Sequence, residues 1–221
     1  MKLNIKSSLV AAIAQFKAAR DIRFYLHGVY VEALPTGGVL IVGTNGHVLG
    51  VWRDLSGEIE RPAILRIGRP LQVACAGAGR RLKIIDDRLA VVDQKGAEIH
   101  IQNRLPTGPN GWEIVAKYPD CRMVFKGAKS ETTATPMDSI NPLYVALVNR
   151  ALSIGSPKKG GCIMLSQAET KGVITILSPD EPDFIAGIMP MLGKPAVYPE
   201  WIKAATIDAP LPGQQPSDAI S

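Results

Sequence analysis

The chain has 221 residues, of which 46% are hydrophobic and 20% are charged, a composition that excludes a disordered chain and indicates a globular one. Lys and Arg total 25 against 20 Asp and Glu, for a net charge of +5, which permits a nucleic-acid partner without requiring one. Cys75, Cys121 and Cys162 are widely spaced, which disfavours a disulfide framework or a zinc site and favours a cytoplasmic location.

The N-terminal part predicts a short strand followed by a helix. Ser7-Ser8 suits a helix N-cap, and apolar residues follow at helical spacing, so we expect a helix over 8–19 that ends at Asp21. The same stretch is too short to span a membrane and contains Lys17. No small-residue cleavage site follows it, so it does not read as a signal peptide.

The rest of the chain continues with strands and helices in a recurring order. Two strands are expected at 22–33 and 38–53, followed by a strand at 60–67 and a helix at 68–78. A third helix is expected at 142–154. The remaining strands are expected at 81–86, 88–93, 97–103, 112–115, 161–167, 172–178 and 183–190.

A strand, a helix and about three more strands therefore occur three times, at 1–57, 58–125 and 126–192; we call these stretches repeat units. They predict an α+β fold in which helices cover one face of antiparallel sheets. We expect one domain of two repeat units at 1–125, a partial domain of one unit at 126–192, and a Pro-rich, partly disordered tail at 193–221.

The run 38–53 is interrupted by Thr44-Asn45-Gly46-His47. One interpretation is a β-bulge beside a core histidine. The other is the wall of a binding site, because a glycine lets a ligand approach the backbone closely.

Three short segments resemble a known family in the same order along the chain. DIRFYLHGVYVEA followed by TNGHVLGV, then KYPDCRMV, then GIMPML, are similar to motifs of the bacterial DNA polymerase III beta sliding clamp. The resemblance covers 1–125 and, less closely, 137–192, and it includes nothing of the family's first domain. The sequence departs from the family at Asn45 (Asp), Val48 (Arg) and Leu192 (Arg), and it continues past the last motif, which suggests a reduced clamp relative of phage or mobile-element origin.

The resemblance implies an apolar cleft that takes short peptides of a polymerase or clamp loader. Methionine side chains adapt to varied apolar partners, as such a cleft requires. Carried over by position, its lining would be Leu26, Thr44, Gly46, His47, Leu49, Pro119, Arg122, Met123, Ile188, Met189, Pro190 and Met191.

The resemblance also implies that duplex DNA is encircled and contacted through its phosphates, independently of sequence. The cations expected on the helices are Lys6, Lys17, Arg20, Arg69, Arg80, Arg81 and Arg150. Closing a ring of about twelve repeat units requires self-association, as four copies if one chain supplies three units or as three copies if it supplies four.

Two alternatives remain open. A clamp mimic would bind clamp-interacting peptides without forming a ring. An enzyme would need a site that the sequence does not display: Gly77-Ala78-Gly79 fits a helix C-terminus better than a phosphate loop. The pairs Asp86-Asp87 and Asp180-Glu181 lie in expected turns. We therefore expect no catalytic activity and no cofactor or metal.

Overall fold

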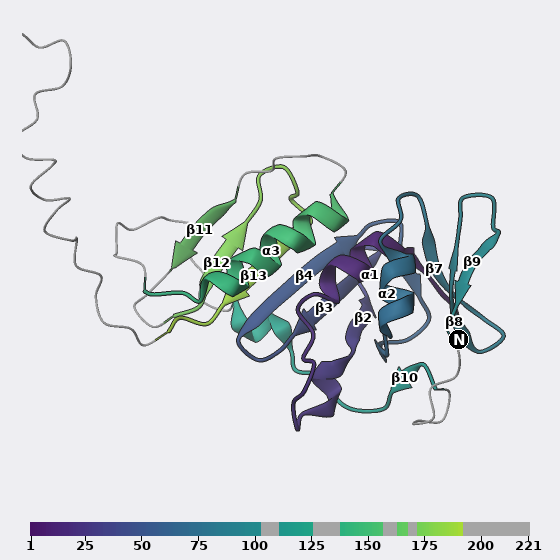
Figure 1. The fold of residues 1–221 in the computed structure, drawn as a ribbon, viewed down its shortest axis with the longest axis horizontal. Helices are drawn as coiled ribbons and strands as arrows, with labels where there is room; N and C mark the ends of the chain where they lie inside the picture. The colour runs from purple at the N-terminus through teal and green to yellow at the C-terminus, as the bar shows by residue number, and fades with distance from the viewer. Residues whose placement is uncertain (103–110, 126–137, 157–162, 168–171, 192–221) are drawn as a thin grey trace, which may run out of the picture. The chain divides into compact units, whose positions relative to one another are not determined.

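Three α-helices pack on two sheets in the computed structural model, which describes residues 1–102, 111–125, 138–156, 163–167 and 172–191 (Figure 1). Neighbouring strands in both sheets run antiparallel. This arrangement confirms the predicted α+β class. The expected tail at 193–221 lies outside the described residues.

The three repeat units fold into similar series of elements. The first comprises β1 (Leu3–Lys6), α1 (Ser7–Ile13), the 3₁₀ helix η1 (Phe24–His27), β2 (Val29–Ala33), β3 (Val39–Thr44) and β4 (Val48–Asp54). The second comprises β5 (Glu58–Ile59), β6 (Ala63–Leu65), α2 (Arg69–Cys75), β7 (Arg81–Ile85), β8 (Arg88–Val92), β9 (Glu98–Ile101), β10 (Glu113–Ile114) and the 3₁₀ helix η2 (Cys121–Val124). The third comprises α3 (Pro142–Gly155), β11 (Met164–Gln167), β12 (Ile174–Leu177) and β13 (Phe184–Ile188).

The repeat units are joined by exchanging strands. One sheet has the order β5-β1-β7-β8-β9 and the other has the order β10-β6-β2-β3-β4-β13-β12-β11. Thus β1, which precedes α1, pairs with β7 of the second unit, and β6, which precedes α2, pairs with β2 of the first. The third unit joins through β13, which pairs with β4 from Phe184↔Trp52 to Ile188↔Val48.

The helices lie side by side on one face, in the order α3, α1, α2 (Figure 1). Along β4, Val48 and Trp52 belong to the core cluster beneath the helices, whereas Leu49 and Val51 belong to a second cluster on the opposite face. This alternation follows from the period of two of a β-strand. Residues of the 111–125 segment, including Ile114 and Tyr118, cover the second cluster.

Two glycines let α1 approach the sheet closely. Gly43 and Gly50 are cross-strand partners on β3 and β4. A Cβ atom at Gly43 would lie 2.6 Å from the Ile13 carbonyl oxygen, and one at Gly50 would lie 2.3 Å from the Phe16 ring. Any larger side chain would therefore push the helix and the turn that follows it away from the sheet.

Three predictions about the first unit were wrong. The helix ends at Ile13 rather than near Asp21, and Ser7 does not cap it: the Ser7 hydroxyl donates to the Cys75 carbonyl oxygen at 2.9 Å. The expected strand 22–33 begins with η1, and its regular part starts only after Gly28.

The expected strand 38–53 is two strands, β3 and β4, and the expected strand 60–67 is reduced to Ala63–Leu65. The third helix begins where predicted and ends at Gly155. Its N-cap is Asn141, whose side chain accepts a hydrogen bond from the Leu143 N–H.

Candidate functional site

Residues 45–47 form the turn between β3, which ends at Thr44, and β4. The Asn45 Oδ1 atom accepts hydrogen bonds from the backbone N–H groups of His47 (2.9 Å) and Val48 (3.0 Å), and the Thr44 hydroxyl accepts from Gly46 N–H (3.0 Å). Gly46 has φ +89°, a conformation that favours glycine. His47 is exposed and is not a core residue.

An apolar pocket of about 200 Å³ opens beside this turn, a volume that suits one large apolar side chain of a ligand. Five residues of the predicted cleft line it: Leu26, Thr44, Gly46, Leu49 and Pro119. The rest of the lining was not predicted from the sequence and comprises Arg23, Tyr25, Tyr118, Asp120, Cys121 and Val124. We refer to this cavity as the turn pocket.

Local contacts fix the rim of the turn pocket. Arg23 donates to the Asp21 carboxylate from Nε at 3.0 Å and from Nη2 at 2.7 Å, and these hydrogen bonds lower the pKa of Asp21. The Arg23 guanidinium lies against the backbone at Gly46, where a Cβ atom would be 2.6 Å from it.

Deeper in the pocket, burial raises the pKa of the Cys121 thiol to about 11 and also raises the pKa of Tyr118. Both groups are therefore neutral at physiological pH.

The 3₁₀ helix η2 supplies one wall of the turn pocket. Its N-cap, Asp120, accepts from Arg122 N–H at 3.0 Å. The Arg122 side chain turns away from the pocket lining and pairs with Glu32 on β2, with a second contact to Asp120 at 3.3 Å. Arg122 therefore anchors the wall instead of lining the pocket.

The predicted cleft residues at 188–191 lie on the other side of the β3–β4 turn. The N–H of Met189 donates to the His47 carbonyl oxygen at 2.9 Å, and the His47 ring stacks on Tyr144 of α3 with centroids 6.4 Å apart. Met189 and Met191 are exposed, as is Met123. Pro190 is half-buried, whereas Ile188 is fully buried in the core and cannot touch a ligand.

Tyr144 is a candidate residue that sequence reasoning missed. It occupies the first turn of a helix whose position was predicted, but only the non-local pairing of β4 with β13 brings that helix beside the β3–β4 turn. No local sequence pattern predicts that Tyr144 lies beside the β3–β4 turn.

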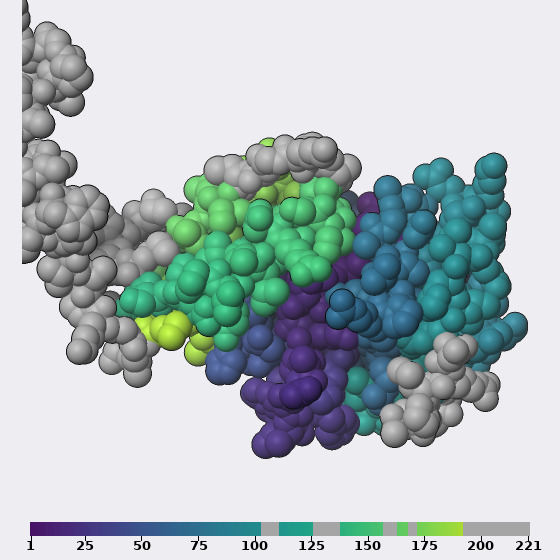
Figure 2. Space-filling model, in the orientation of Figure 1, coloured from purple at the N-terminus to yellow at the C-terminus, as the bar shows by residue number. Residues whose placement is uncertain are grey.

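A second candidate site is a groove of about 590 Å³ that runs between the three helices. Figure 2 views this helix face, where residues of α3, α1 and α2 form adjoining bands. Lys17, Arg69 and Arg150 line the groove, together with His27, Gln15 and Gln72 and several small or apolar residues. We call it the helix groove.

The three predicted cations of the helix groove are available for a ligand. None of them forms an ion pair with another residue in the part of the chain that the structure describes. Lys17 donates from Nζ to the Ile67 carbonyl oxygen at 2.5 Å, and burial lowers its pKa. A bound anion would give these groups a charge partner.

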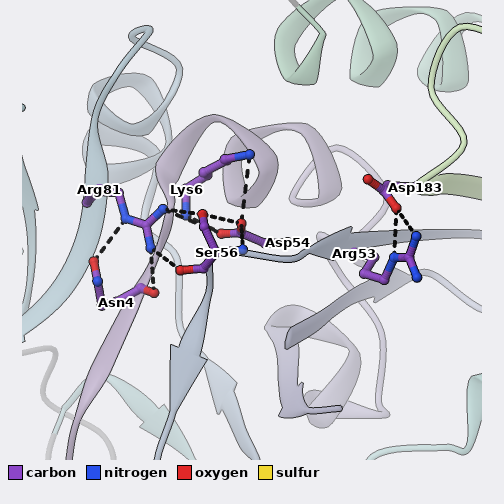
Figure 3. Close-up of polar contacts among 7 residues, drawn as sticks. All are labelled: Asn4, Lys6, Arg53, Asp54, Ser56, Arg81 and Asp183. Atoms are coloured by element: carbon purple, nitrogen blue, oxygen red, sulfur yellow. Dashed lines mark hydrogen bonds and ion pairs between the residues drawn. The ribbon is translucent and has the colours of Figure 1, made fainter. Parts of the chain in front are cut away.

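Two other predicted cations belong to a network around Asp54 (Figure 3). The fully buried Asp54 carboxylate accepts hydrogen bonds from Lys6 N–H at 2.7 Å and from the N–H and hydroxyl of Ser56. It also forms ion pairs with Lys6 Nζ at 3.9 Å and with Arg81 Nη1 at 3.8 Å. Arg81 also donates to Asn4 and Ser56. These contacts join β1, β4 and β7 and leave both cations outside the helix groove.

The remaining two cations do not line the helix groove either. Arg80 donates from Nη1 to the Ala74 carbonyl oxygen at 2.8 Å, near the end of α2. Arg20 is exposed in the segment that follows α1.

No constellation of metal-ligating side chains occurs within the described ranges. Asp86 and Asp87 form the β7–β8 turn, as predicted, with φ of 47° and 56°. None of the described helices is long and apolar enough to cross a membrane.

The fold is shared with bacterial sliding clamps. No protein-family profile and no curated protein matches the sequence. Among solved structures, the chain is similar to DNA polymerase III subunit beta from Borrelia burgdorferi in complex with a natural product, with 14% identity and a TM-score of 0.56 over 88% of this chain and 63% of that one. The chain thus spans less than two thirds of that protein's length.

Two further clamps show the same likeness. The sliding clamp of Pseudomonas aeruginosa with ligand has 14% identity and a TM-score of 0.54 over 86% of this chain and 66% of that chain. The beta sliding clamp of C. crescentus has 13% identity and a TM-score of 0.54 over 87% and 66%. At these identities the similarity establishes a clamp-like fold, and the fold alone.

Proposed function

We propose that the protein is a sliding-clamp-like factor that encircles duplex DNA as a homo-oligomer and tethers replication proteins to it. The observation that carries the proposal is the helix groove, because one cation from each repeat unit converges on it: Lys17 just after α1, Arg69 on α2 and Arg150 on α3. Cations that form no ion pair within the described ranges are suited to DNA phosphates, which are bound independently of base sequence.

We propose that the turn pocket is the anchor point for a short peptide of a polymerase or clamp loader. The solved neighbours are subunits of DNA polymerase III, and the pocket contains five of the residues expected for such a site. Its volume of about 200 Å³ suits one Leu, Met or Phe side chain, which would act as a buried anchor. The rest of the peptide would contact the exposed methionines Met123, Met189 and Met191.

Encirclement requires several copies of the chain. If the chain supplies three repeat units, as the sequence predicts, four copies would supply the roughly twelve units of a clamp ring. Each copy would direct its helix groove toward the duplex. Neither catalysis nor a cofactor enters this proposal.

The test is the salt dependence of binding to a duplex oligonucleotide. The proposal predicts that neutralising Lys17, Arg69 and Arg150 together to Gln lowers the slope of log K against log salt by about 2–3, since each lost phosphate contact removes about 0.9. Fluorescence anisotropy over a salt series measures this slope.

The matched control carries the same charge change away from the helix groove, at Lys83, Lys95 and Lys117, none of which lines it. Equal losses in the two triple variants would show that net charge, rather than the groove, binds the duplex. Salt-independent association of the unaltered protein would contradict the proposal.

The turn pocket also supports a second candidate function, a clamp mimic that captures clamp-binding peptides without a ring. A mimic does not need the helix groove. Peptide binding that persists in a protein with no salt-dependent affinity for duplex DNA would favour this function.

A further inference from the structure

We infer that two copies of this chain pair through β11, the last strand of the eight-stranded sheet, so that the sheets of both copies join about a two-fold axis. The inference rests on the proposed function, which requires several copies, and deepens it by naming one contact between them. Figure 1 shows β11 at the end of the row β4-β13-β12-β11. Two such pairs would supply the four copies expected for a ring.

The equivalent strands of the other two repeat units have a partner on each side. β2 and β7, like β11, are the first strands after the α-helix of their unit. Each pairs with the strand that the neighbouring unit exchanges, β6 or β1, and their core residues Val31 and Leu82 are fully buried. Within the described ranges β11 pairs with β12 alone. The core of the third unit therefore has an open end at β11.

Apolar side chains are exposed at this open end. Leu165 lies opposite Ile176, a fully buried residue of the core beneath the helices, yet 37% of Leu165 is exposed. On the other face of the sheet, Met164 and its cross-strand partner Leu177 are also exposed. An apolar strand at the edge of a sheet is a template for pairing with another strand.

The other three sheet edges carry features that oppose such pairing. β5 and β10 have two residues each, and their glutamates form ion pairs, Glu58 with Lys2 and Glu113 with Arg61. β9 begins with Glu98, and its pairing with β8 contains a register shift. Short length, charge and irregular pairing protect an edge strand. β11 is longer than β5 and β10, carries no charge and pairs with β12 in an unbroken register.

A second copy of β11 is the partner that fits this edge. Pairing about a two-fold axis brings each residue close to its own counterpart, so a charged strand would repel itself. Residues 164–167 are uncharged and avoid this cost. Side chains alternate between the two faces of a sheet, so the helices of both copies stay on one face if Leu165 lies opposite Leu165 of the second copy. The two leucines then cover each other at the end of the core.

A disulfide tests both the pairing and its register. Directly opposite residues of antiparallel strands have Cα atoms about 4.5–5.5 Å apart, which a disulfide can span. Leu165→Cys, in a protein that also carries Cys162→Ser, should therefore form a cross-linked dimer on mild oxidation, with twice the 23.7 kDa of one chain on a non-reducing gel.

The matched control is Leu177→Cys in the same Cys162→Ser background. Leu177 is similarly exposed, at 43%, but it lies on β12, one strand further from the proposed axis. Its two copies would be about 14 Å apart, or three strand spacings, and should not cross-link. Equal cross-linking of the two cysteine variants would overturn the inference.

Light scattering measures the contribution of β11 to the assembly. Leu165→Lys places two like charges opposite each other and should halve the solution mass. Leu55→Lys, at an exposed leucine just after β4, should leave the mass unchanged.

The outcomes separate this inference from the proposed function. An unchanged mass in Leu165→Lys would overturn the inference, and salt-dependent duplex binding by the same variant would leave the proposed function standing with a different contact between copies. A mass of one chain for the unaltered protein at every concentration would overturn both.

Discussion

The charged side chains of this protein have two kinds of role. Some stabilise the fold through contacts within the chain, and others line the helix groove, where they can bind a ligand. The contrast is visible in Figure 3, where Asp54 is surrounded by donors while Arg53 and Asp183 form a separate, more exposed pair. Lys6 and Arg81 look like DNA-binding residues in the sequence because they flank helices. Their contacts with a fully buried carboxylate give them a structural role.

Asp54→Asn should lower the free energy of unfolding by about 1–3 kcal/mol, because the buried site loses hydrogen bonds to a charged acceptor and leaves Lys6 and Arg81 without their counter-charge. Urea-induced unfolding measures the loss. Asp183→Asn is the control: Arg53 and Asp183 are partly exposed, so removing that charge should cost less than about 1 kcal/mol. Similar small losses in the two variants would mean that the Asp54 network does not stabilise the fold.

At the scale of single elements, the sequence predicted those elements whose signals are local. The third helix was found because apolar residues follow Pro142 at helical spacing, although its N-cap, Asn141, was not recognised. The first helix was predicted too long because Phe16 and Ala18 continue the apolar pattern. They are buried by the sheet and by the second core cluster without being helical, and periodicity cannot separate these two causes.

The sequence of the β3–β4 turn contains a hairpin signal, which the prediction of a single strand at 38–53 gave too little weight. Asn45-Gly46 is a strong hairpin indicator, yet the flanking apolar residues suggested one long strand. Five of the eleven residues that line the turn pocket were predicted, Thr44, Gly46 and Leu49 among them, because the family resemblance covers this turn. Tyr118 and Cys121 were not, because the packing of 111–125 on the far face of the sheet is non-local.

The wall formed by η2 provides a prediction at this scale. Arg122→Glu should weaken the binding of a peptide with a Leu or Phe anchor by about three- to tenfold, because it places two like charges together at Glu32 and releases η2 from β2. Combining it with Glu32→Arg should restore most of the affinity, since the swapped pair can form again.

Fluorescence anisotropy with a labelled peptide measures both variants of this charge swap. A loss that the second substitution does not reverse would show that Arg122 contacts the peptide itself. The pairing with Glu32 would then not be what positions the wall.

For the whole molecule, the sequence predicted the α+β class and the recurrence of a helix followed by strands. It could not predict the exchange of β1 and β6 between repeat units or the pairing of β13 with β4. Those pairings join residues more than 30 positions apart, and no periodicity within a segment encodes them. They are also what gathers Lys17, Arg69 and Arg150 around one groove.

The central claim is that several copies of this chain assemble around DNA, and the solution mass tests it most directly. Light scattering over a concentration series should give a stable mass of about four times the 23.7 kDa of one chain, because an isolated chain cannot surround a duplex. A mass that stays at that of one chain at high concentration would contradict encirclement. It would leave the peptide-binding mimic as the function that the fold and the turn pocket support.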